Sequence, residues 1–232
     1  MQTILITGAG RGIGLELARQ YIAEGGWKVL ACCRQPERAT ELKALQASSR
    51  GSLEIHSLEV RDGRQIAALA TKLRGTAIDV LLNNAGVYGQ RAEALGSIEP
   101  DTWRLTLEVN ALAPLKICEA FVDHVARSDR RMMAAITSRM GSIADNSSGS
   151  HYAYRASKAA LNAAMKSLSI DLAGRRIICV VLHPGWVRTA MGGTQAPLSV
   201  SESVTGLRKV MAQATLAHSG RFLGYDGAEI PW

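Results

Sequence analysis

The sequence predicts an α/β fold, a single doubly wound parallel sheet of about seven strands with helices on both faces. Short, β-branched apolar runs alternate with helix-length segments along all 232 residues, which is the pattern of right-handed β-α-β units. The apolar runs are nearly continuous, as expected for strands that are covered on both faces. No linker, long charge run or internal repeat interrupts the chain. We therefore expect one domain over residues 1–232.

The expected strands occupy residues 2–7, 28–33, 53–58, 79–83, 132–137 and 177–182, with a short seventh strand near 221–223. Helical segments are expected between them, at residues 13–24, 36–47, 64–74, 101–125 and 153–172. Ligands of such sheets bind at the carboxyl ends of the strands. Functional residues should therefore follow the strands directly.

The composition is typical of a folded globular protein. Hydrophobic residues make up 47% and charged residues 20% of the chain, which argues against disorder. No apolar run approaches the roughly 18 residues that cross a bilayer, and the N-terminus lacks the basic region of a signal peptide. We expect a cytoplasmic protein without a membrane partner.

The charge is basic but dispersed. Lys and Arg number 27 against 20 Asp and Glu, a formal net charge of +7. The bases stand singly or in pairs, such as Arg130-Arg131 and Arg175-Arg176, so no nucleic-acid partner is expected unless they cluster in space. A small anionic ligand would fit the same charge equally well.

Cysteine and histidine spacing predicts no metal site. The cysteines are Cys32, Cys33, Cys118 and Cys179. None shows a C-x-x-C spacing, and the histidines stand alone, so neither zinc nor a dithiol redox site is expected. The cysteines are interpreted as small buried hydrophobes in a reducing compartment.

A glycine cluster follows the first strand and opens the first helix. Residues 7–14 read Thr-Gly-Ala-Gly-Arg-Gly-Ile-Gly. Gly8, Gly12 and Gly14 suit a tight turn and the close approach of a phosphate, and the helix N-terminus offers N–H groups to a pyrophosphate. The spacing is G-x-x-x-G-x-G rather than the common G-x-G-x-x-G. In this position, the cluster predicts a dinucleotide site.

The end of the second strand indicates which dinucleotide. A carboxylate there would bind the ribose 2′-OH of NAD, but the sequence reads Cys33-Arg34-Gln35. Arg34 can pair with a 2′-phosphate, and Arg11 in the glycine loop is placed to help. The alternative is that Arg34 is a solvated loop base. NADP(H) is therefore favoured, with NAD(H) still open.

Tyr154 and Lys158 are four residues apart and share one helix face. A nearby ammonium favours the phenolate, so Lys158 is expected to lower the pKa of Tyr154. Tyr152 competes for the same role, but only Tyr154 has a lysine at i+4. A tyrosine and a lysine at this spacing are most often an ordinary surface pair, so a catalytic role for them depends on the other motifs in the sequence.

Further polar residues fall after strands, where a ligand should lie. Ser138 ends the fifth strand, Asn83-Asn84-Ala85-Gly86 ends the fourth, and Asn110 lies in the helical segment that follows. Residues 184–189, Pro-Gly-Trp-Val-Arg-Thr, come after the sixth.

Together these motifs resemble the short-chain dehydrogenase/reductase family, over nearly the whole chain and in the family's order. Residues 138–146, 182–193 and 226–232 resemble the branch that contains C-factor-like proteins and sniffer-type carbonyl reductases. The resemblance implies a Rossmann-type fold and an oxidoreductase that interconverts a carbonyl compound and an alcohol.

The resemblance also implies roles for single residues. Tyr154 would be the general acid, Ser138 would hold the carbonyl oxygen, and Lys158 would tune Tyr154 and bind the nicotinamide ribose. Asn110 would hold a water that links Lys158 to solvent. The implied cofactor site comprises Gly8, Arg11, Gly12, Ile13, Gly14, Arg34, Glu59, Val60, Asn84, Ala85, Gly86, Tyr154, Lys158, Pro184, Gly185, Val187 and Thr189.

Two departures from the family pattern concern the periphery of the site. Glu59 stands where the family usually has an aspartate that contacts adenine, and Ser138 precedes Tyr154 by a longer interval than usual.

The substrate pocket is expected in loops 87–97, 139–150 and 187–200, and the family suggests a homodimer or homotetramer. The alternative is a C-factor-like dinucleotide-binding signalling protein with little or no turnover.

Overall fold

A computed structural model describes residues 1–91 and 93–232. It contains one sheet of seven parallel strands in the order β3-β2-β1-β4-β5-β6-β7. The strands are β1 (Gln2–Thr7), β2 (Trp27–Cys33), β3 (Leu53–Ser57), β4 (Val80–Asn83), β5 (Met132–Ile136), β6 (Ile178–His183) and β7 (Phe222–Gly224). The strand order reverses between β1 and β4, so the predicted doubly wound, Rossmann-type sheet is confirmed.

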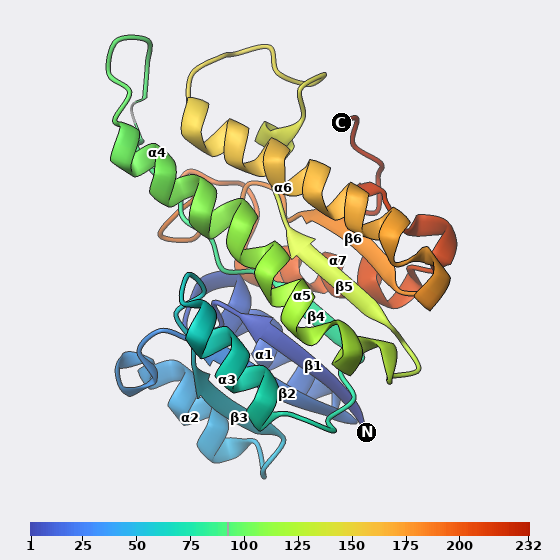
Figure 1. Ribbon diagram of the computed structural model, residues 1–232. Helices are drawn as coiled ribbons and strands as arrows, with labels where there is room; N and C mark the ends of the chain where they lie inside the picture. Colours follow the sequence, from blue (N-terminus) through green and yellow to red (C-terminus); the bar gives the residue numbers. More distant parts are fainter. Residues whose placement is uncertain (92) are drawn as a thin grey trace.

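Helices cover both faces of this sheet. They are α1 (Gly12–Glu24), α2 (Thr40–Ser48), α3 (Gly63–Lys72), α4 (Pro100–Leu107), α5 (Ala113–Ala126), α6 (Tyr152–Asp171) and α7 (Val200–Gln213). In Figure 1, α3, α5 and α6 lie in front of the sheet, and α1 and α7 lie behind it.

The strands are apolar on both faces because each face packs against helices. In β1, Ile4 and Ile6 join the core beneath α1 and α7, whereas Leu5 joins the core beneath α3, α5 and α6. All three are fully buried, which confirms the interpretation of the continuous apolar runs. The four cysteines are free and buried, as predicted.

The expected single helix over residues 101–125 is wrong, because a π-helical turn (Glu108–Leu112) separates α4 from α5. The break follows from Pro114, which has no N–H to donate to the carbonyl of Asn110 four residues earlier. The N–H of Ala113 donates instead to Glu108, five residues back. The segment 36–47 is also divided, into a 3₁₀ turn (Pro36–Arg38) and α2.

Helix α7 was not anticipated, although its start has a recognisable signal. The Ser199 hydroxyl accepts from the N–H of Glu202, and the Glu202 carboxylate accepts from the N–H of Ser199. This capping box ends the predicted loop 187–200. No helix in the described part of the chain is long and apolar enough to cross a membrane.

Candidate active site

The glycine loop is packed so tightly that side chains are excluded from it. Gly8 has a φ of +68°, and a Cβ there would lie 2.8 Å from the Cα of Ala85. A Cβ on Gly14 would overlap the carbonyl oxygen of Gly8. The Thr7 hydroxyl accepts from the N–H groups of Asn84 (3.0 Å) and Ala85 (3.1 Å). The ends of β1 and β4 therefore form one rigid floor.

The start of α1 offers backbone donors at this edge. Its N-cap residue, Arg11, makes no capping hydrogen bond with its side chain, and the first turn carries no acidic residue. Gly12 lies close to the loop after β6, since a Cβ on Gly12 would be 3.7 Å from the Cγ2 of Thr189. An uncapped helix start with free N–H groups suits an anionic group such as a pyrophosphate.

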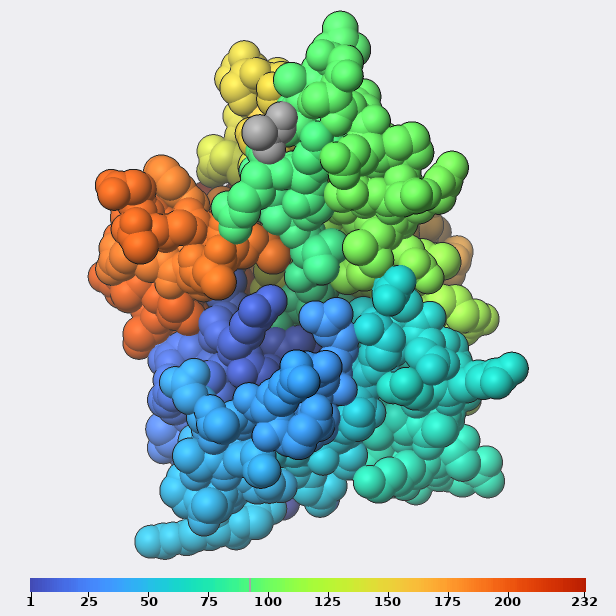
Figure 2. Space-filling view, turned by 90° about the vertical axis from the view of Figure 1, so that its left-hand side faces the viewer, coloured from blue at the N-terminus to red at the C-terminus, as the bar shows by residue number. Residues whose placement is uncertain are grey.

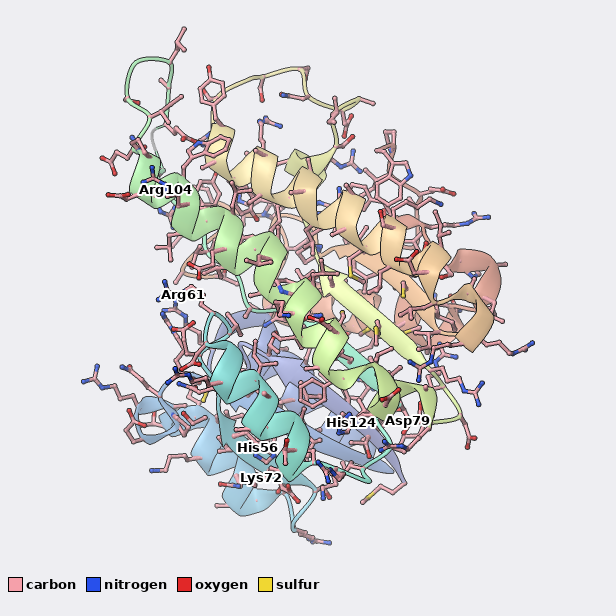
Figure 3. All side chains as sticks on the ribbon, in the orientation of Figure 1. His56, Arg61, Lys72, Asp79, Arg104 and His124 are labelled. Atoms are coloured by element: carbon pink, nitrogen blue, oxygen red, sulfur yellow. The ribbon has the colours of Figure 1, made fainter. Side chains whose placement is uncertain are left out.

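Arg34 and Glu59 lie after β2 and β3 and face each other. The Arg34 side chain is 66% exposed, and its Nη1 is 3.9 Å from Oε2 of Glu59. Glu59 also pairs with Arg61, whose Nε is 3.5 Å away; Figure 3 shows Arg61 beside the start of α3. The adjacent Val60 is buried. Arg34, predicted to bind the 2′-phosphate, thus pairs with Glu59, predicted to contact adenine. The sequence did not indicate this pairing.

Tyr154 is buried in the first turn of α6. Tyr154 is 8% exposed, whereas Tyr152 is 37% exposed. The ring of Tyr88 stacks on that of Tyr154, with centroids 4.5 Å apart and planes 19° from parallel. Burial raises the pKa of Tyr154 to about 12, although the neighbouring Ser138 side chain acts to lower it. The phenol is thus protonated at neutral pH.

Lys158 lies one helical turn further and is 4% exposed. Its Nζ donates to the carbonyl of Ile136 at 2.9 Å and lies 5.9 Å from the centre of the Tyr154 ring. Burial lowers the pKa of Lys158 to about 8. Lys158 was expected to lower the pKa of Tyr154; in the free protein the pKa is raised instead, because the loss of hydration outweighs other effects.

Asn110 is fully buried in the π-helical turn. Its Oδ1 accepts from the N–H of Val87 (2.9 Å), and its Nδ2 donates to the carbonyl of Val87 (2.8 Å) and the hydroxyl of Ser157 (3.0 Å). A Cβ on Gly86 would lie 3.3 Å from Asn110 Oδ1 and 3.7 Å from Lys158 Nζ. Asn110 therefore ties the segment after β4 to α6, close to Lys158.

Ser138 follows β5, and its hydroxyl accepts from the N–H of Met140 at 3.1 Å. His183 at the end of β6 supports the same turn, because its Nδ1 accepts from the N–H of Arg139 at 3.3 Å. Burial, with a contribution from Arg139, lowers the pKa of His183 to about 4, which keeps the ring neutral. This support was not predictable, because His183 stands alone in the sequence.

Glu93 is a second residue whose role the sequence does not indicate. Its side chain is 2% exposed, Oε2 accepts from the N–H of Ala153 (2.7 Å), and Oε1 accepts from Nε1 of Trp103 (2.9 Å). Helix α6 receives no cap from His151, its own N-cap residue, which has a φ of +53°. Glu93 thus caps α6 from the loop after β4, next to Tyr154.

The loop after β6 covers the remaining side of the site. The carbonyl of Pro184 accepts from the hydroxyl of Ser203, Gly185 has a φ of +82°, and Val187 pairs with Leu198. A cavity of about 540 Å³ is lined by Arg188, Thr189, Ala190, Gly193 and Thr194. Figure 2 shows this segment, in orange, against the green segment that follows β4.

The structure brings Asn110, Ser138, Tyr154 and Lys158 together beside β4 and β5, with the glycine loop next to them. Arg34 and Glu59 lie further along the edge, beyond β1. Within the predicted substrate loop 87–97, Ala92 lies outside the described residues. Among residues 1–91 and 93–232, no group of three or more His, Cys, Asp or Glu could hold a metal ion.

Comparison with known proteins identifies the family. Residues 2–197 match the family model described as short chain dehydrogenase. The C-signal of Myxococcus xanthus is 46% identical over 165 residues, which cover 71% of this chain and 99% of that protein. Both chains are fully covered in the match to the carbonyl reductase Sniffer of D. melanogaster, with a TM-score of 0.95 and 33% identity.

An NADPH-bound carbonyl reductase from chicken fatty liver has a TM-score of 0.93 and 35% identity, covering 100% of this chain and 99% of that one. These relatives confirm the branch suggested by residues 138–146, 182–193 and 226–232. The chain belongs to the short-chain dehydrogenase family and is an NAD(P)-dependent oxidoreductase.

Proposed function

We propose that the protein reduces an aldehyde or ketone to an alcohol with NADPH, or catalyses the reverse reaction, with Tyr154 as general acid or base. One observation carries the proposal: the Tyr154 hydroxyl is buried beside Ser138, which acts to lower its pKa, and Lys158 lies one turn further along α6. Two ionisable groups buried together at the ligand-binding edge of the sheet are typical of a catalytic site.

The residues at the edge of the sheet fit a dinucleotide. Gly8 and Gly14 leave no room for side chains, and the start of α1 is free to bind phosphate. The dinucleotide would be held by Gly8, Arg11, Gly12, Ile13, Gly14, Glu59, Val60, Asn84, Ala85, Gly86, Lys158, Pro184, Gly185, Val187 and Thr189. When bound, its nicotinamide supplies the hydride for reduction or accepts it in oxidation.

In the reduction, Tyr154 donates its phenolic proton to the carbonyl oxygen, which becomes the hydroxyl of the alcohol. A pKa near 12 means that this proton is present at neutral pH. Ser138 holds the oxygen by a hydrogen bond, and the Lys158 ammonium stabilises the phenolate that remains. Asn110 holds the Val87 segment and Ser157 in place; its water-binding role stays a prediction.

The cofactor preference for NADP(H) rests on Arg34. Its exposed guanidinium follows β2. Its ion pair with Glu59 is long and therefore weak, so a bound 2′-phosphate can replace Glu59 as the partner of Arg34. Structural relatives were solved with NADP or NADPH bound.

Replacement of Tyr154 by phenylalanine tests the proposal. Tyr154→Phe keeps the ring and its stacking on Tyr88 but removes the proton, so kcat for aldehyde reduction should fall at least about a hundredfold. NADPH affinity, measured by fluorescence titration, should change little. The matched control is Tyr152→Phe, which should retain most activity. Full activity of Tyr154→Phe on a good substrate would refute the mechanism.

Several further expectations belong to the same proposal. The substrate is a small carbonyl compound or alcohol bound between loops 87–97, 139–150 and 187–200, and residues 1–232 form one domain. The chain forms a homodimer or homotetramer, for which the exposed leucines 105, 112 and 115, in α4, the π-helical turn and α5, provide apolar surface. A cytoplasmic location stays a prediction.

A second candidate is a dinucleotide-binding signalling protein with little or no turnover. The 46% identity to a protein named C-signal favours it. The burial of Tyr154 and Lys158 in one pocket weighs against it, because a protein that only binds a dinucleotide has no need of a proton donor.

A further inference from the structure

Arg91 spans the entrance to the site. Its Nη2 donates to the carbonyls of Ala190 (2.9 Å) and Met191 (3.2 Å), so it joins loop 87–97 to loop 187–200. Its guanidinium carbon lies 5.5 Å from the centre of the Tyr88 ring. Since Tyr88 stacks on Tyr154, this positive charge lies one aromatic ring away from the proposed proton donor.

Arg155 brings a second positive charge to the same place. It follows Tyr154 directly, and its guanidinium donates to the carbonyl of Gly149 (3.1 Å), the hydroxyl of Ser148 (2.8 Å) and the carbonyl of Met140 (3.4 Å). Arg91 and Arg155 both act to lower the pKa of Tyr88, although burial raises it overall. The positive charges of Arg91 and Arg155 therefore both act on Tyr88.

Neither charge is neutralised by the protein. Arg91 and Arg155 bond to carbonyls and a hydroxyl, and within residues 1–91 and 93–232 neither forms an ion pair. Two carboxylates belong to the same loops, and each is engaged elsewhere. Asp145 pairs with Arg139 at 3.3 Å, and the buried Glu93 caps α6. The entrance thus keeps an excess of positive charge.

We propose that the carbonyl substrate carries a carboxylate, which binds to Arg91 at the entrance while its carbonyl reaches Tyr154. This rests on the proposed function. The Nε and Nη1 donors of Arg91 make no hydrogen bond to the described residues, so they are available for a charge-assisted bond to a carboxylate. The Tyr88 ring separates Arg91 from Tyr154, so a spacer of the size of one aromatic ring would suit the distance between the two groups of the substrate.

Two aldehydes test the proposal. 4-Carboxybenzaldehyde carries the charge, and its methyl ester has the same ring and a similar electron-withdrawing group without charge. Wild-type kcat/KM with NADPH should be at least tenfold higher for the acid. Arg91→Gln should lower kcat/KM for the acid at least tenfold, through KM, and leave the ester within twofold. Arg104→Gln is the control, because Arg104 is exposed on α4 and paired with Asp101 (Figure 3).

Binding is measured separately, by calorimetric titration of benzoate into the protein saturated with NADP⁺. Wild type should bind benzoate, and Arg91→Gln should bind it at least tenfold more weakly. The inference would be overturned by equal kcat/KM values for the acid and the ester, or by equal losses of kcat/KM for both in Arg91→Gln. It would also be overturned by weaker NADPH binding in that variant, or by the absence of benzoate binding to the wild type. If benzoate binds through Arg91 but neither aldehyde is reduced, the carboxylate site stands and the proposed reaction fails.

Discussion

Replacement of Lys158 by methionine should stabilise the fold while removing a proposed catalytic group. Burial lowers the pKa of Lys158 from 10.5 to about 8, and each pKa unit is about 1.4 kcal/mol. Keeping the ammonium charged in the folded protein at pH 7 therefore costs about 3 kcal/mol. Lys158→Met removes this cost but leaves the Ile136 carbonyl without its donor, a loss of about 1–2 kcal/mol. The free energy of unfolding should rise by about 1–2 kcal/mol.

The sign of the pH dependence gives the sharper test. The unfolded chain keeps the Lys158 proton up to about pH 10.5, and the folded chain loses it near pH 8. Wild-type stability therefore gains from this group as pH rises through that window. The advantage of Lys158→Met should shrink by about 2 kcal/mol between pH 7 and pH 9.5.

Urea unfolding of both proteins at pH 7 and pH 9.5, at one protein concentration, measures both effects. Lys43→Met, on the exposed face of α2, is the control and should stay within about 0.5 kcal/mol of wild type at both pH values. A Lys158→Met protein that is less stable than wild type at pH 7, or whose difference from wild type does not change with pH, would refute the reasoning.

Two further substitutions test the periphery of the site. Arg34→Ala should weaken NADPH binding by about 1.5–3 kcal/mol, the value of a charged hydrogen bond, and leave NADH nearly unaffected; equal losses in fluorescence titrations would show that Arg34 does not bind the 2′-phosphate. Glu93→Gln leaves one of the N–H donors of Ala153 and Trp103 facing an amide NH₂ group, so the free energy of unfolding in urea should fall by about 1–3 kcal/mol. Unchanged stability would mean that the cap on α6 is dispensable.

Strand positions were predictable because they depend on the residue types within one short segment of the sequence. A strand covered on both faces must be apolar throughout, and Ile4, Leu5 and Ile6 are fully buried for that reason. The edge at which the functional residues meet was also predictable, since the carboxyl ends of parallel strands point the same way. Ser138 and Asn84 each follow a predicted strand, so the sequence alone predicts that they lie at one edge.

Contacts between distant loops could not be predicted in the same way. Glu93 looks like a solvated loop carboxylate, and its role depends on Ala153, sixty residues away along the chain. His183 supports the turn after Ser138 only because β5 and β6 are neighbours in the sheet. The π-helical turn had a local signal in Pro114, but the apolar periodicity of residues 101–125 continues through it and favoured one long helix.

One physical cause, burial, shifts the pKa values of both groups in the pocket. It raises the pKa of Tyr154 and lowers that of Lys158, so the free protein at neutral pH holds a phenol with its proton in place. In the proposed mechanism this state can donate a proton to a carbonyl oxygen, whereas oxidation of an alcohol first requires the phenolate. Removing the proton from Tyr154 in this pocket costs about 3 kcal/mol more than in water, since its pKa lies about two units above the usual value. Under the proposed mechanism, the free protein near neutral pH is therefore in the protonation state that reduction requires.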